Sequence, residues 1–174
     1  MLKIINETKD GEQIDETIYS KLGKIYVGDI CYALDDKVYD EIWGKKYNYA
    51  NGKFEVSNDN FFAVDSTAYG DGNYKGTDGK SYSVDAGVIG AVPQELWKSN
   101  ITESELNSLG TILNTNQCQF CSEMGYFEIY YNGGKYIHID TANNEEEYED
   151  EAEYCENCGN EMQYCTCEED DEDY

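Results

Sequence analysis

The sequence predicts an α+β domain that is mostly β, built as a compact antiparallel sheet or a barrel-like sheet with three short helices. An acidic, zinc-binding C-terminal tail is expected to follow it. Three observations predict this: short β-branched and aromatic runs, turn signals between them, and an abrupt change of charge near residue 143. A chain of 174 residues is long enough for one such domain and an appendage.

The expected strands come first along the chain. Residues 24–34, 52–57 and 61–70 (KIYVGDICYAL, GKFEVS and FFAVDSTAYG) are rich in β-branched and aromatic side chains. Asp78 and Gly79 then lie between two tyrosine-bearing segments. An Asp-Gly pair in that position predicts a hairpin with a type I′ turn, because this turn needs positive φ at both central residues.

A second hairpin is expected over residues 125–141, with Asn132, Gly133 and Gly134 at its turn. Side chains alternate between the two faces of a strand. The first strand is therefore predicted to place Phe127, Ile129 and Tyr131 on one face. In the second strand, Ile137 and Ile139 share a face, and Tyr136, His138 and Asp140 share the opposite one.

Three helical segments are expected between the strands. The first has Asp35 or Asp36 as its N-cap and Gly44 as its stop. The second opens with the only proline of the chain, which suits a first helical turn. The third carries a capping box, with Thr102 followed three residues later by Glu105. The segments are residues 34–44, 92–100 and 102–110.

Charge divides the chain into two parts. The sequence has 37 acidic residues and 12 lysines, no arginine, and a net charge of -25. Residues 143–174 contain 15 of the acidic residues and no lysine. We therefore predict a β-rich globular domain over residues 1–142 and an acidic tail over residues 143–174. This charge disfavours direct binding to nucleic acid phosphates or to anionic membranes, since both require clustered lysine or arginine.

No signal peptide or transmembrane segment is visible, so we expect a cytoplasmic protein, in the host cytoplasm if it is phage-encoded. Disulfides are disfavoured in a reducing compartment, and clustered cysteines there indicate metal ligands. The tail holds two pairs of closely spaced cysteines, and six residues separate the pairs. A set of four cysteines makes a closed tetrahedral site, which is typical of structural zinc. The predicted ligands are Cys155, Cys158, Cys165 and Cys167.

Two other cysteine groupings stay open. Cys118 and Cys121 are also separated by two residues. Together with the first cysteine pair of the tail, they would form a zinc ribbon across the second hairpin. Alternatively, they could join Cys31 and His138 in a site with three cysteines and one histidine. For Cys31 alone, a buried free thiol is the simpler interpretation.

A carboxylate site is the candidate for enzymatic chemistry. Asp65, Asp71 and Asp85 lie beside glycine-rich turns, and His138 is the only histidine. A histidine with an aspartate two residues away could act as a general base, although no nucleophile motif accompanies it. This grouping defines the alternative hypothesis of a small enzyme with an unknown substrate.

Five pieces of sequence in one order resemble an uncharacterised family of small β-rich domains from phages and bacteria. They are VGDICYAL, DEIWG, FAVDSTAYGDGNY, YSVDAGVIGAVPQELW and YIHIDT, and the resemblance covers roughly residues 25–141. The resemblance implies a single compact domain and assigns no catalytic residues. The cysteine-containing tail lies outside it and resembles short zinc ribbons.

Charge and the lack of a catalytic motif favour a non-enzymatic binding or inhibitor protein. Such a protein would dock on a basic surface of a host protein, where its carboxylates could mimic nucleic acid. The first predicted helix is a candidate docking face, because it carries Asp35, Asp36, Asp40 and Glu41. The small enzyme, and a structural or accessory protein, are the alternatives.

Overall fold

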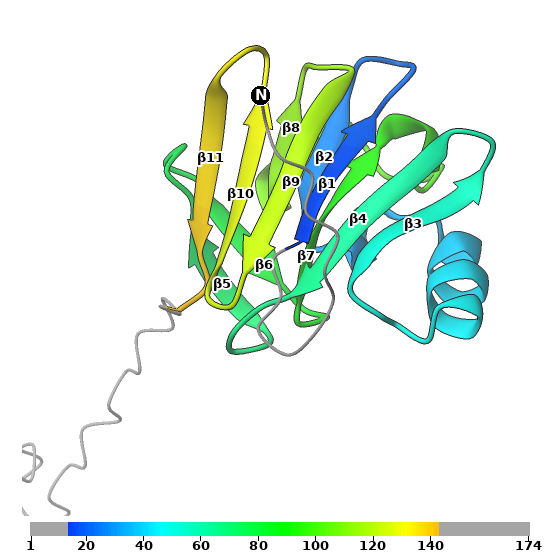
Figure 1. Cartoon of the computed structure of the whole chain (residues 1–174), viewed down its shortest axis with the longest axis horizontal. Coiled ribbons are helices and arrows are strands. Elements are labelled where there is room, and N and C mark those ends of the chain that lie inside the picture. The colour runs from blue at the N-terminus through cyan, green and yellow to red at the C-terminus, as the bar shows by residue number, and fades with distance from the viewer. Residues whose placement is uncertain (1–13, 143–174) are drawn as a thin grey trace, which may run out of the picture.

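The computed structural model describes residues 14–142, and these residues form three layers (Figure 1). A four-stranded sheet packs on one face of a five-stranded sheet, and short helices cover the other face of the larger sheet. All strand pairs are antiparallel. The mostly β prediction is confirmed. The barrel-like alternative is wrong, because the two sheets keep separate hydrogen-bond ladders and do not close.

The smaller sheet has the order β1 (Ile14–Tyr19), β9 (Gln117–Glu123), β10 (Tyr126–Tyr131) and β11 (Lys135–Asp140). The larger sheet has the order β3 (Gly52–Ser57), β4 (Asn60–Ser66), β7 (Val88–Pro93), β2 (Ile25–Gly28) and β8 (Thr111–Leu113). A separate hairpin consists of β5 (Gly72–Lys75) and β6 (Ser81–Val84). The helices are α1 (Ile30–Ala33), the π-helix η1 (Val38–Lys46) and α2 (Glu103–Leu109), and the 3-10 turn is η2 (Gln94–Leu96). None of these helices is long and apolar enough to cross a membrane.

Two apolar cores follow from the alternation along the central strands. In β2, Ile25 and Val27 point into the core between the sheets, whereas Tyr26 points into the core beneath the helices. The four strand residues are all buried. A sheet that is buried on both faces does not alternate in polarity, so its strands appear as continuous apolar runs. This explains why β7, VIGAVP, carries no polar side chain.

Both predicted hairpins are present. In the β5–β6 hairpin, however, only Gly79 of the Asp78-Gly79 pair has positive φ, at 80°. The type I′ prediction is therefore wrong. The Asp78 carboxylate instead accepts hydrogen bonds from Tyr82 and Thr111, which holds it in a three-residue loop with Gly79 in the left-handed region. In the second hairpin, the register pairs Phe127 with Ile139 and Ile129 with Ile137, which is consistent with the predicted alternation.

The helix predictions have mixed outcomes. The capping box of α2 is confirmed, with the Thr102 and Glu105 side chains each bound to the other residue's backbone. Gly44 does not stop η1, which continues to Lys46. A Cβ at Gly44 would lie 2.8 Å from ring atoms of Tyr49, so this glycine serves ring packing.

The segment after Pro93 forms only the three-residue turn η2. Trp97 returns to an extended conformation and makes a β-bridge with Leu34. Lys98 donates its backbone N–H to the carbonyl of Ala33. Because the chain is paired with this distant segment, it cannot continue as a helix. The predicted tail over residues 143–174 lies outside the described residues.

Candidate functional site

The outer face of the four-stranded sheet is the candidate site. The inward side chains of its strands, among them Phe120, Phe127 and Ile129, are fully buried or nearly so. The alternate positions face away from the core, and the strand register aligns them in rows across the sheet. The rows are Glu123–Tyr126–Asp140, Asp15–Cys121–Glu128–His138, Thr17–Gln119–Tyr130–Tyr136 and Tyr19–Gln117.

The first two rows form what we call the acidic end of this face. They hold four carboxylates and no lysine. The Cβ atoms of residues directly opposite each other on neighbouring strands lie about 4.5–5.5 Å apart. The acidic end therefore concentrates negative charge over a small area. The carboxylates are Asp15, Glu123, Glu128 and Asp140.

Glu128 is the centre of a polar network at the acidic end. Its carboxylate accepts a 2.8 Å hydrogen bond from the hydroxyl of Tyr130 and lies 3.2 Å from Nδ1 of His138. The His138 ring stacks on Tyr126, with ring centroids 5.0 Å apart. The side chains of Glu128 and His138 remain 26% and 30% exposed, so a ligand can reach them.

The two tyrosines beside these carboxylates are held in their neutral form. A hydrogen bond to Glu128 raises the pKa of Tyr130 to about 12, and one to Glu123 raises the pKa of Tyr126 to about 12. Neither phenol ionises near neutral pH, so these two rings add no negative charge to that of the carboxylates. Neutral aromatic rings beside carboxylates suit a cationic ligand, because a lysine or arginine gains both ion pairing and cation–π attraction.

The structure does not bring together the four residues of the predicted carboxylate site. Asp65 lies between the sheets, where it accepts a hydrogen bond from the Ser122 hydroxyl. Asp71 and Asp85 flank the Gly72–Val84 pair at one end of the β5–β6 hairpin, so the register places these two near each other, whereas His138 lies on the outer face of β11. Among residues 14–142, no three histidine, cysteine, aspartate or glutamate side chains are arranged to hold a metal ion. Within residues 14–142, the four residues of the enzyme hypothesis therefore do not form one site.

The structure argues against both cysteine groupings that use Cys118 with Cys121. These two thiols leave β9 on opposite faces, Cys118 toward the core and Cys121 outward. Burial raises the pKa of each thiol to about 12, and for Cys121 the nearby Asp15 adds to the effect. Cys31 belongs to α1, in the helical layer. Two thiols on opposite faces of one strand cannot ligate the same ion.

The predicted zinc ligands Cys155, Cys158, Cys165 and Cys167 lie outside the described residues, so the tail site stays a prediction.

Three of the four carboxylates of the predicted docking helix are already engaged within the fold. Asp36 lies 2.7 Å from Nζ of Lys98, and Glu41 pairs with Lys45 one helical turn away. Asp35 accepts hydrogen bonds from two backbone N–H groups at the start of η1. Lysines therefore offset part of the charge on this side of the molecule.

Sequence reasoning missed one buried carboxylate. Asp29 is fully buried and accepts backbone hydrogen bonds from Cys31 at 2.8 Å, Asp85 at 2.8 Å and Ala86 at 2.7 Å. It caps α1 and ties this helix to the loop after β6. Its position between Gly28 and an apolar segment was the available signal, since aspartate is a preferred N-cap.

Comparisons of the chain with family profiles, with curated protein sequences and with solved structures found no match. The resemblance to small β-rich domains of phages and bacteria therefore stays an expectation.

Proposed function

We propose that this protein is a non-enzymatic acidic binding protein, and that it engages a lysine- or arginine-containing segment of a partner protein. The acidic end of the four-stranded sheet is the proposed docking surface. The observation that carries this proposal is the register, which gathers four carboxylates and the neutral ring of Tyr126 on two rows without a lysine and places the neutral ring of Tyr130 on the next row. Where the partner surface normally binds phosphates, these carboxylates would mimic nucleic acid.

The electrostatics support a role in both encounter and specificity. A strongly negative chain attracts a basic partner over distance, which accelerates association. Glu123 and Glu128 then contribute at short range, because each holds a fixed hydrogen bond to a tyrosine and is thereby oriented before binding. Preorganised groups lose less conformational entropy when they bind.

A pair of double variants tests this surface. Glu123→Gln with Glu128→Gln removes two charges from the acidic end of the sheet, and Asp36→Asn with Glu41→Gln removes two from the helical side. The full chain and both variants would be titrated with a fluorescent lysine- and arginine-rich peptide at low and high salt. We expect the sheet variant to bind about tenfold more weakly and the helix variant less than about twofold, because each close pair contributes up to about 1 kcal/mol.

Both variants keep the acidic tail and change the net charge equally. Equal weakening in the two variants would therefore show that total charge, and not this surface, controls binding. A wild-type protein that does not bind the peptide at low salt would refute the proposed function itself.

A further inference from the structure

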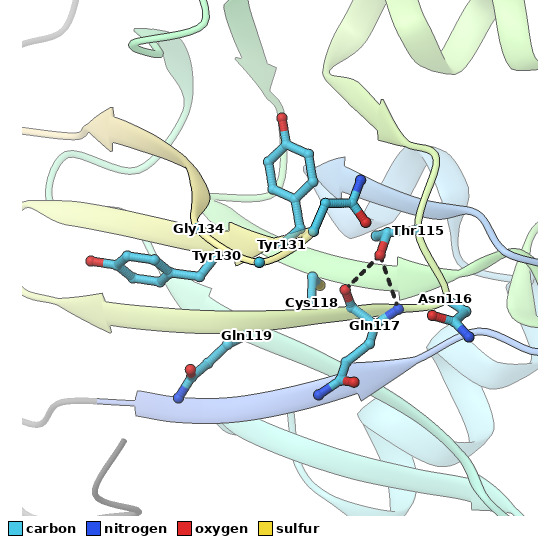
Figure 2. Close-up of a pocket in the computed structure, with 10 residues that line it drawn as sticks. Thr115, Asn116, Gln117, Cys118, Gln119, Tyr130, Tyr131 and Gly134 are labelled. Atoms are coloured by element: carbon cyan, nitrogen blue, oxygen red, sulfur yellow. Dashed lines mark hydrogen bonds between the residues drawn. The ribbon is translucent and has the colours of Figure 1, made fainter. Parts of the chain in front are cut away.

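The other end of the four-stranded sheet has a hollow lined by uncharged residues. The hollow has a volume of about 440 Å³ and lies where the loop entering β9 faces the β10–β11 turn (Figure 2). We call it the amide groove, because carboxamides dominate its polar lining. Its lining residues are Thr115, Asn116, Gln117, Cys118, Gln119, Tyr130, Tyr131, Asn132, Gly133 and Gly134.

None of these ten residues carries a charge, although 28% of the residues in the chain are charged. The lack of charged residues in the lining indicates which class of ligand fits the groove. A phosphate or carboxylate ligand would meet no cation in this lining, and a basic ligand would meet no carboxylate in it. The groove therefore suits a ligand that is polar but neutral.

Several polar atoms of the groove are available for such a ligand. The side-chain amides of Asn116 and Gln117 make no hydrogen bond within residues 14–142. The Thr115 hydroxyl, by contrast, is used twice: it donates to the carbonyl of Gln117 at 2.8 Å and accepts from its N–H at 3.3 Å (Figure 2). Thr115 thus fixes the backbone that carries the two uncommitted carboxamides.

Aromatic rings border the carboxamides. Tyr130 stacks on Tyr136 with a centroid separation of 5.6 Å, and the Tyr136 side chain is 49% exposed. Tyr19 is 54% exposed and lies directly opposite Gln117 in the strand register. Large exposed aromatic side chains at one end of a sheet indicate a contact surface. The same part of the face therefore offers apolar ring faces and paired donor and acceptor groups.

We propose that the amide groove binds a neutral saccharide. A carboxamide presents a donor and an acceptor in one plane, which matches the neighbouring hydroxyls of a sugar ring, each of them both donor and acceptor. The apolar C–H face of the sugar can pack on a tyrosine ring. A volume of about 440 Å³ lies within the range of about 300–1,000 Å³ that is usual for ligand sites. This inference is independent of the basic partner proposed for the acidic end.

The test is a titration of the full chain with neutral oligosaccharides, namely gluco-, manno- and chito-oligosaccharides, followed by NMR chemical shifts. We expect at least one series to shift the signals of residues 115–119 and 130–134 at millimolar concentration. Asn116→Ala and Gln117→Ala should each weaken that binding by about two- to tenfold, the effect of one hydrogen bond. Gln94→Ala, which removes a carboxamide from η2, is the matched control and should have no effect.

Three results would overturn the inference. They are the absence of any shift in the groove, equal weakening by Gln94→Ala, and displacement of the sugar signal by a neutral peptide that binds more tightly. The last result would identify a peptide groove. Saccharide binding should also persist at high salt and in a Glu123→Gln variant, which leaves the Glu128–Tyr130 hydrogen bond in place. Failure of this inference is therefore distinguishable from failure of the proposed function.

Discussion

Replacing Asp29 by alanine should destabilise the fold more than the loss of any exposed carboxylate. Asp29 is fully buried and accepts three backbone N–H groups, two on one carboxylate oxygen and one on the other. Two of the donors, Asp85 and Ala86, lie 56 and 57 residues after Asp29 in the chain. Alanine leaves these donors without an acceptor and also removes the N-cap of α1.

The size of the expected decrease in the free energy of unfolding follows from those three hydrogen bonds. A hydrogen bond to a charged group contributes about 1.5–3 kcal/mol, and a buried donor left unsatisfied costs about 1–3 kcal/mol. Removing part of a buried charged network typically costs about 3–5 kcal/mol after relaxation, so we expect about 4 kcal/mol for Asp29→Ala. For a chain of this size, that corresponds to a decrease in Tm of roughly 8–16 °C.

Asp35→Ala is the matched control. Asp35 also accepts two backbone N–H groups at a helix start, but it is only partly buried. Losing such a cap costs about 1 kcal/mol. Urea unfolding of the two variants and the wild type at neutral pH measures the difference. Equal destabilisation by the two substitutions, or less than about 1 kcal/mol for Asp29→Ala, would refute the reasoning because it would mean that water or a rearranged loop satisfies the freed donors.

Two further predictions concern the tail and the edge of the four-stranded sheet. Purified protein should carry about one zinc ion per chain, because four thiolates saturate one tetrahedral ion. Metal analysis should show its loss in the Cys155→Ser, Cys158→Ser variant and its retention in Cys118→Ser, Cys121→Ser; the reverse pattern would assign zinc to the strand cysteines. Burial raises the pKa of Glu16. Its ionisation is therefore less favourable in the folded state, so the free energy of unfolding should decrease as the pH rises from the unfolded-state pKa through the folded-state pKa. Glu16→Gln should then raise Tm at neutral pH, with a gain in stability of less than about 1 kcal/mol for a half-buried group near Lys53, and should leave Tm unchanged near about pH 3. A Tm increase of the same size at both pH values would contradict this account.

Local patterns in the sequence determined most of the elements. The alternation of residues 127–140 correctly placed Phe127 and Ile129 on one face, which the structure buries, and Tyr136, His138 and Asp140 together on the opposite face. The capping box correctly located α2. These signals succeed because side-chain period and cap chemistry depend on neighbouring residues alone. Local patterns contain no information on distant contacts. The turn at Asp78 was therefore misassigned, because its conformation is held by Thr111, 33 residues away.

Only the tertiary structure decided which residues meet. The acidic end of the sheet needs β1 beside β9, although more than 100 residues separate Asp15 from Cys121. Similarly, Asp29 meets Asp85 and Ala86 only because the larger sheet brings the start of α1 beside the loop after β6. No local pattern specifies such pairings, because strand order and register follow from burying both apolar faces at once. The sequence therefore determined the elements and the sign of the charge, and the fold determined where that charge is concentrated and where the uncharged amide groove lies.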